Sequence, residues 1–147
     1  MNQEEKQRIS ELMAEENLLC FTTMGEQWPT ATIQAFAHTP ELHVALIMQE
    51  SSDRFQNIMR RPNVSYLIDN REHGDPAKFQ VRRLAVRGIA QEVPRGSQEW
   101  EQLKALFLGK NPFEAPFFGR DTLRIVRVVP KQLKYVDGLS KPVVAEL

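Results

Sequence analysis

The sequence has few cysteines and histidines and lacks a common hydrolase motif, and each of these absences excludes a class of protein or site. There is one cysteine, Cys20, among 147 residues, so no internal disulfide can form and we expect a cytoplasmic protein. The three histidines, His38, His43 and His73, do not have the spacing of a metal site, and we expect no bound metal. The Gly-x-Ser-x-Gly motif that would indicate an α/β-hydrolase is also missing.

An excess of charge of either sign is missing too. Lysine and arginine number 19, and so do aspartate and glutamate, which gives a formal net charge of zero. A general nucleic-acid binder needs a basic excess to neutralise phosphates, so we expect no nucleic-acid partner. The longest strongly apolar run, residues 44–48, is far shorter than the roughly 18 residues of a membrane helix, so no membrane partner is expected.

What is present has the balance of a globular protein. Hydrophobic residues make up 41% of the chain and charged residues 26%, which is typical of a soluble domain. A chain of this length can bury a sizeable core without disulfides or metals. We therefore expect one domain that spans residues 1–147.

The periodicity predicts strands with helices inserted between them. Helical spacing occurs over residues 3–16, over a short segment that stops before Pro62, and after Ser97. Strand patterns occupy residues 18–24, 30–37, 42–48, 64–69 and 79–93, with a last strand at 123–129 and 132–136 that is interrupted at Pro130.

The first three strands are spaced like an antiparallel meander, and Gly88 suits a bulge. Since no βαβ alternation appears, we predict an α+β, mainly β fold. The specific expectation is a six-stranded antiparallel barrel with peripheral helices, closed so that no strand edge is left exposed. The segment from Gly138 onward shows no period.

The most informative segment is a buried strand that runs straight into a helix start at Ser51-Ser52-Asp53-Arg54. The first turn of a helix has unpaired N–H groups and favours an anion. Two hydroxyls and a guanidinium would complete a phosphate cradle there. The alternative is structural: Ser52 caps the helix and Arg54 is solvated, and Asp53 competes for the same positive end.

The run Ser52-Asp-Arg-Phe-Gln-Asn-Ile58-Met-Arg-Arg-Pro62-Asn-Val64 resembles the signature Ser-x-Lys/Arg-x₃-Leu-x₃-Pro-x-Val of the FMN-binding split barrels, the pyridoxamine 5′-phosphate oxidase-like proteins. Arg87-Gly88-Ile89-Ala90 resembles their later Val-x-Gly-x-Ala segment, and the order of elements matches from about residue 9 to residue 93. The resemblance implies a homodimeric split barrel with one FMN in each of two interface clefts. It also implies an oxidoreductase that acts on a small-molecule substrate.

The resemblance assigns roles residue by residue. Ser52 and Arg54, with Ser51 beside them, fall where the FMN phosphate is held. Two strand segments fall along the isoalloxazine ring: Thr32, Ile33 and Gln34 on the second strand, and Ile47, Met48 and Gln49 on the third. A polar contact from the partner subunit would come from Gln80 by residue type or from Arg83 by spacing, and the sequence leaves both open.

Three departures from the family pattern narrow the function. The oxidases have an arginine where this chain has Thr32, and they have a C-terminal extension with a tryptophan and an Arg-rich Pro motif that is not found here. The haem-degrading branch uses a C-terminal histidine, whereas His73 is the last histidine of this chain. We therefore do not expect pyridoxamine phosphate oxidation itself, and a non-catalytic flavin, deazaflavin or haem binding protein stays open as the alternative.

A late loop carries three phenylalanines, Phe113, Phe117 and Phe118. Two interpretations fit so many aromatic side chains. They pack over the end of the barrel or against a subunit, or they form a lid over a flat ligand.

Overall fold

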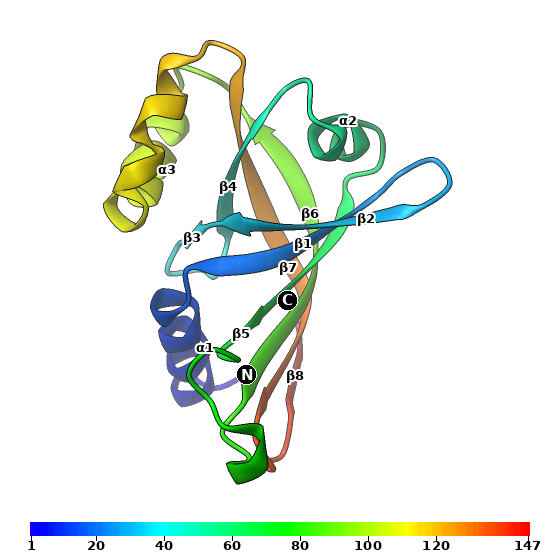
Figure 1. Ribbon diagram of the computed structural model, residues 1–147, viewed down its shortest axis with the longest axis vertical. Helices are drawn as coiled ribbons and strands as arrows, with labels where there is room; N and C mark the ends of the chain where they lie inside the picture. The colour runs from blue at the N-terminus through cyan, green and yellow to red at the C-terminus, as the bar shows by residue number, and fades with distance from the viewer.

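The computed structural model describes all 147 residues and contains one antiparallel sheet with helices around it (Figure 1). The strands are β1 (Leu18–Met24), β2 (Pro29–Ala35), β3 (Ala37–His38), β4 (Val44–Gln49), β5 (Asn63–Asp69), β6 (Arg82–Val93), β7 (Leu123–Asp137) and β8 (Val143–Glu146). The α-helices are α1 (Gln3–Glu15), α2 (Asp53–Arg60) and α3 (Gln98–Lys110). Two 3₁₀ segments are η1 (Pro76–Lys78) and η2 (Pro112–Gly119). The mainly β, antiparallel architecture predicted from the sequence is confirmed.

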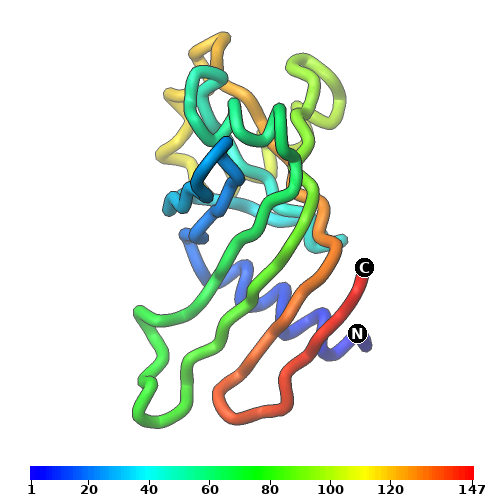
Figure 2. The backbone as a smooth tube through the Cα atoms, turned by 90° about the vertical axis from the view of Figure 1, so that its right-hand side faces the viewer, coloured from blue at the N-terminus to red at the C-terminus, as the bar shows by residue number.

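The sheet has the strand order β2-β1-β5-β6-β7-β4-β3, so β2 and β3 end it without pairing to each other. β7 pairs with β6 on one side, and on its other side first with β4 and then with β8. Figure 2 shows the long hairpins of β5–β6 and β7–β8 extending past α1, with both chain ends near each other. The predicted closure by strand pairing is therefore wrong, because the barrel is split between β2 and β3.

The predicted meander is correct for its first hairpin and wrong for its third strand. β1 and β2 pair antiparallel over their whole length. β4, however, pairs with β7, and it reaches the end of the second predicted strand only through Ala37 and His38. The reason is burial on both faces of β4, which is typical of a strand inside a sheet that is covered on both sides.

The strand count is eight rather than the predicted six. β3 has two residues, and β8 is short and exposed on alternate residues, so neither has a strong sequence signal. Pro130 does not interrupt the last strand, because it lies opposite Gly88 at a register shift, where its missing N–H costs little. The register between β6 and β7 shifts between Arg87 and Gly88, so the predicted bulge is confirmed. A Cβ atom on Gly88 would come within 2.6 Å of the Val129 carbonyl oxygen, so the bulge also needs glycine.

Two predicted strands begin too early, each for a backbone reason. Leu42, at the predicted start of the third strand, has φ +67°, and β4 begins at Val44. Phe79 ends η1 with φ +56°, and β6 begins at Arg82. Neither residue type signals a left-handed conformation.

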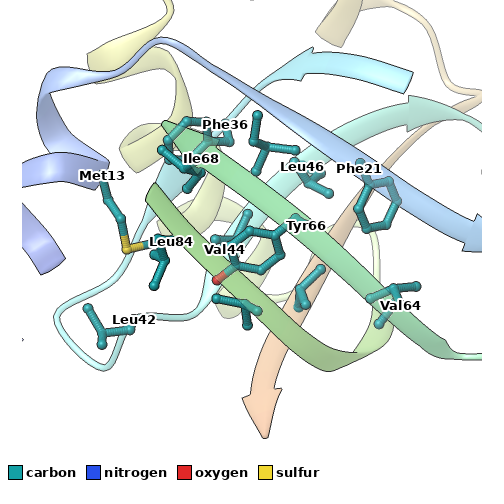
Figure 3. Close-up of a cluster of buried hydrophobic side chains, with 14 of the residues drawn as sticks. Met13, Phe21, Phe36, Leu42, Val44, Leu46, Val64, Tyr66, Ile68 and Leu84 are labelled. Atoms are coloured by element: carbon teal, nitrogen blue, oxygen red, sulfur yellow. The ribbon is translucent and has the colours of Figure 1, made fainter. Parts of the chain in front are cut away.

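The core is divided between the two faces of β4. Val44, Leu46 and Met48 point into the larger cluster, which fills the concave side of the sheet with residues of every strand except β2 and β3 and is closed at one end by α1 (Figure 3). Ala45 points the other way, into a smaller cluster under α3. β4 therefore lies between the two clusters, and α2 follows directly after it.

The helices follow from their caps and apolar faces. Asn2 and Glu5 form a reciprocal capping box at the start of α1, which buries Ile9, Leu12 and Met13. Ser97 caps α3, as predicted. None of these helices combines the length and the apolarity that a membrane crossing requires.

Candidate functional site

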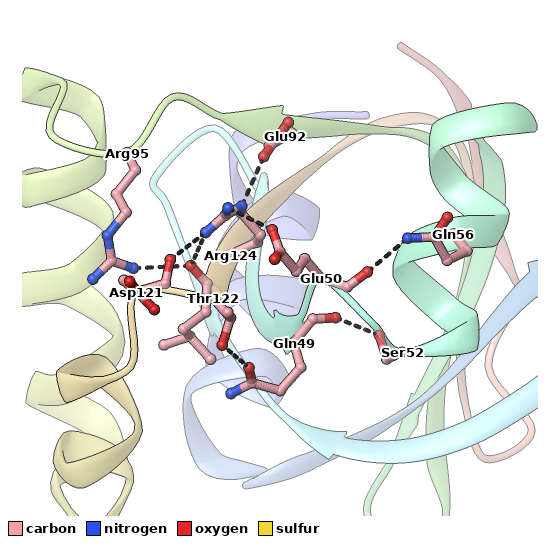
Figure 4. Close-up of polar contacts among 10 residues, drawn as sticks. Gln49, Glu50, Ser52, Gln56, Glu92, Arg95, Asp121, Thr122 and Arg124 are labelled. Atoms are coloured by element: carbon pink, nitrogen blue, oxygen red, sulfur yellow. Dashed lines mark hydrogen bonds and ion pairs between the residues drawn. The ribbon is translucent and has the colours of Figure 1, made fainter.

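A cavity of ≈ 360 Å³ lies where the ends of β2 and β4 meet the start of α2 and the η2 segment. Six of the predicted site residues line it: Ile33, Gln34, Ile47, Met48, Gln49 and Arg54. Figure 4 shows α2 and the α3–η2 region on opposite sides of the end of β4, with Gln49 between them. The structure thus brings together residues that the sequence places on three separate segments.

Arg54 is the cation of this cavity. It lies in the first turn of α2 and makes no ion pair in the structure. Its Nε is buried and has no hydrogen-bond partner. Burial lowers the pKa of the guanidinium below its ordinary value, although an arginine stays charged at neutral pH. A half-buried, unpaired charge of this kind favours an anion that enters the cavity.

Ser52 is the N-cap of α2. Its Oγ accepts from the Phe55 N–H at 3.2 Å and donates to the Gln49 carbonyl oxygen at 2.8 Å. The capping alternative is therefore confirmed for Ser52, and the hydroxyl is occupied by the protein itself. Ser51 is exposed at the same corner and does not line the cavity.

Two glutamines in the cavity wall have their amide oxygens occupied by threonines. The Thr32 hydroxyl donates to Gln34 Oε1 at 3.3 Å, and the Thr122 hydroxyl donates to Gln49 Oε1 at 2.6 Å. The Gln34 Nε2 is buried without a partner, which costs roughly 1–3 kcal/mol until an acceptor reaches it. With Arg54, the wall therefore offers hydrogen-bond donors and suits a ligand rich in acceptors.

An ion-pair network holds the end of β4 against β6 and β7 (Figure 4). Arg124 contacts Glu50 at 2.6 Å and Glu92 at 3.3 Å, and it also donates to the Asp121 carbonyl oxygen at 2.7 Å. The Glu50 N–H donates to the Thr122 carbonyl oxygen at 3.0 Å. Sequence reasoning missed Thr122 and Arg124, because their contacts join segments more than 30 residues apart and no local pattern marks them.

The three phenylalanines of the late loop divide between the two interpretations. Phe118 is buried and packs edge-on against Trp100 at 6.2 Å between ring centroids. Phe113 and Phe117 are 69% and 41% exposed, and both line the cavity. The loop is therefore anchored by one aromatic ring and borders the cavity with two.

The remaining predicted residues do not reach the cavity in this chain. Thr32 contacts Gln34 rather than the cavity itself. Gln80 lies in the loop before β6, where its Oε1 accepts from the Asp75 N–H at 3.2 Å. Arg83 is exposed on β6, paired in register with Asp69 and Val136.

Solved structures resemble this chain over nearly its whole length, whereas no protein-family model and no curated protein matches it. HutZ of Vibrio cholerae, described as a haem storage protein, is 23% identical with a TM-score of 0.76, over 92% of this chain and 97% of HutZ. A candidate pyridoxamine 5′-phosphate oxidase of Listeria innocua is 18% identical with a TM-score of 0.70, over 90% of this chain and 98% of that one.

The fold is a split barrel. A haem binding protein of Mycobacterium smegmatis shares it at a TM-score of 0.86 and 13% identity, over 99% of this chain and 59% of that protein. The expectation of the pyridoxamine 5′-phosphate oxidase-like fold is therefore confirmed. Neighbours of this split barrel are named for haem as well as for the oxidase, so the fold alone does not select the ligand.

The lining of the cavity adds a chemical criterion that the fold does not supply. No histidine lines the cavity of this split barrel. His38 lies elsewhere, with its Nε2 at 2.9 Å from the Ser10 hydroxyl, and His43 and His73 are also outside the lining.

Proposed function

We propose that this protein binds FMN in the cavity and acts as an FMN-dependent oxidoreductase on a small molecule. The observation that carries the proposal is Arg54, a half-buried guanidinium without an ion pair at the start of α2. An arginine fits a phosphate through parallel N–H groups, and the positive end of α2 adds to the attraction. A phosphate monoester there would give the Arg54 Nε the partner that it lacks.

The other lining residues suit the ring of a flavin. An oxidised isoalloxazine presents mainly acceptors along its polar edge, which matches the free amide nitrogens of Gln34 and Gln49. Ile33, Ile47 and Met48 provide an apolar surface for the rest of the ring. When bound, FMN supplies a carrier for hydride or electrons, and the residues of the chain bind and orient it.

Thr32 and Thr122 have an indirect part in this proposal. Each hydroxyl occupies one glutamine oxygen, so the amide nitrogen is the group left to meet a ligand. Donors directed at the ring favour the reduced flavin, on which negative charge accumulates. Both threonines thus orient a donor without touching the ligand.

Haem binding has support from the neighbours named for haem, and the chemistry of the lining favours flavin. Haem iron is most often held by a histidine, and the cavity has none. Met48 is a conceivable axial ligand, but it is 2% exposed and its side chain belongs to the main core cluster. The proposal therefore places FMN first, with a deazaflavin or haem as the alternative ligand and non-catalytic binding as the alternative role.

We also propose a homodimer with the flavin at its interface. Ile33 is 69% exposed and lines the cavity together with the exposed Leu18 and Phe113, and a group of exposed apolar side chains of this kind suits coverage by a second subunit. Of the two candidates for a partner contact, Arg83 fits better, since the Gln80 amide oxygen is occupied within its own loop. The free thiol Cys20 suits a reducing cytoplasm.

The test is reconstitution of the purified protein with FMN, with riboflavin and with haem in parallel, followed by the visible spectrum after gel filtration. We expect stoichiometric FMN, weaker riboflavin and no haem. Protein that stays colourless with excess FMN refutes the proposal. A haem spectrum at stoichiometric loading would also refute it and would support haem binding instead. Sedimentation of the FMN-loaded protein as a monomer refutes the dimer.

A further inference from the structure

The η2 segment places two exposed aromatic rings, Phe113 and Phe117, in the lining of the cavity. Its inward ring, Phe118, is fixed against Trp100 and Phe107 at centroid distances of 6.2 and 6.3 Å. Pro112 and Pro116 lie within η2 and restrict its backbone. Phe113 and Phe117 therefore stay exposed because of the fold of the segment itself. When a flat ligand covers two solvent-exposed rings beside a cavity, the burial of their apolar surface favours binding.

Arg120 follows η2 directly and also lines the cavity. Its backbone is fixed, since its N–H donates to the Phe117 carbonyl oxygen at 3.1 Å and its carbonyl oxygen accepts from the Leu123 N–H at 3.2 Å. The side chain makes no ion pair, and its guanidinium carbon lies 5.7 Å from the centre of the Phe117 ring. Glu114 lines the same cavity, and the two arginines outnumber it.

The cavity thus has guanidinium groups from two elements on opposite sides of β4. Arg54 belongs to α2, and Arg120 follows η2 (Figure 4 shows these elements flanking the end of β4). One FMN carries one phosphate, and Arg54 accounts for it in the proposed function. Arg120 and its neighbouring rings are left without a ligand group.

We propose that Phe113, Phe117 and Arg120 form a second subsite, which binds a planar aromatic substrate carrying an anionic group. The ring of the substrate lies against the two phenylalanines, and its carboxylate or other anion pairs with Arg120. This inference rests on the proposed function, because it names the substrate class for the same cavity. It adds a recognition element that lies outside the segment resembling the split-barrel signature.

The experiment titrates three probes into the protein, with and without saturating FMN, by calorimetry. The probes are 2-naphthoate, its neutral isostere 2-naphthamide, and cyclohexanecarboxylate, which keeps the charge and lacks the aromatic ring. We expect 2-naphthoate to bind at least about tenfold more tightly than either analogue, because it alone has both features that the subsite recognises.

Variants assign the binding to the subsite. Arg120→Gln is expected to weaken 2-naphthoate binding by about tenfold and to leave 2-naphthamide unchanged, since one charged contact is lost. Phe117→Leu is expected to weaken both aromatic probes by several-fold. Arg60→Gln is the matched control: Arg60 is exposed on α2, makes no ion pair and does not line the cavity, so neither probe should change.

The outcomes separate this inference from the proposed function. Equal affinity for the three probes, or unchanged 2-naphthoate binding in Arg120→Gln, overturns the subsite. Displacement of FMN by 2-naphthoate overturns it as well, because one site would then serve both ligands. Failure of the protein to bind FMN refutes the proposed function, while the titration without FMN still decides whether the subsite exists.

Discussion

Replacement of Arg54 by glutamine is the sharpest test of the anion site. Glutamine keeps a polar side chain that ends at the position of the arginine Nε, and it removes the charge and the paired N–H groups. A charge-assisted hydrogen bond contributes about 1.5–3 kcal/mol. Arg54 is half-buried, so solvent screens part of this contribution and the lower half of the range applies. We therefore expect the dissociation constant for FMN to be about 10- to 50-fold higher in the variant than in the wild type.

The phosphate-free flavin provides the internal reference. Riboflavin shares the ring and ribityl chain of FMN, so its affinity should be the same in Arg54→Gln and in the wild type. The measurement is the quenching of flavin fluorescence, titrated for both ligands in both proteins at one ionic strength. The preference for FMN over riboflavin is expected to collapse, and Arg60→Gln, on the exposed side of the same helix, should preserve it.

The free energy of unfolding shows whether weaker FMN binding in Arg54→Gln comes from the lost contact or from a less stable protein. The Nε of Arg54 is buried without a partner in the free protein, so its removal should leave the apo protein as stable or make it more stable. FMN affinity that does not change, or riboflavin affinity that falls together with it, would contradict the assignment of the phosphate to Arg54.

Three further substitutions follow from the structure. Ser52→Ala removes the cap of α2 and should lower the free energy of unfolding by about 1 kcal/mol in chemical denaturation, with no lowering if the cap were idle. Gly88→Ala places a Cβ atom 2.6 Å from a backbone oxygen and should destabilise the protein by about 1–3 kcal/mol, measured the same way; a neutral result would contradict the close approach. Burial lowers the pKa of Lys110 to about 8, so its titration by NMR should be centred there, and a midpoint near 10.5 would refute this. Because the unfolded chain holds that proton up to higher pH, the free energy of unfolding should rise with pH from about 8 towards 10.5, and Lys110→Met should remove this rise.

Local patterns predicted the elements whose signals are local. The strand at residues 18–24 was predicted with its observed limits, because a short apolar run that contains threonine marks it. The helix after Ser97 was predicted with its observed start, because an N-cap marks it. The bulge at Gly88 was also predicted, because glycine in a strand has few other uses. The predictions that failed concern long-range pairing. β4 pairs with β7, and nothing in the sequence of β4 indicates which strand it pairs with.

The candidate site divides in the same way. The strand-to-helix corner predicted Arg54 and Ser52 as a pair, and the structure separates them, since Ser52 caps the helix while Arg54 lines the cavity. Met48 and Gln49 were predicted through the resemblance to the split-barrel family, and both line the cavity. Thr122 and Arg120 could not be predicted, because it is the path of the chain between α3 and β7 that brings Arg120 to the cavity and Thr122 to the Gln49 side chain.

The position of β4 in the sheet has a consequence for the synthesis of the protein. β4 pairs with β3 over two residues and otherwise with β7, which follows it only after α2, two further strands and α3 have been made. On the ribosome, the most apolar strand of the chain therefore emerges long before the backbone groups that complete it. The cavity at the end of β4 cannot form until translation has passed Val128, and a chain arrested earlier would expose an apolar, half-paired strand to neighbouring chains or to chaperones.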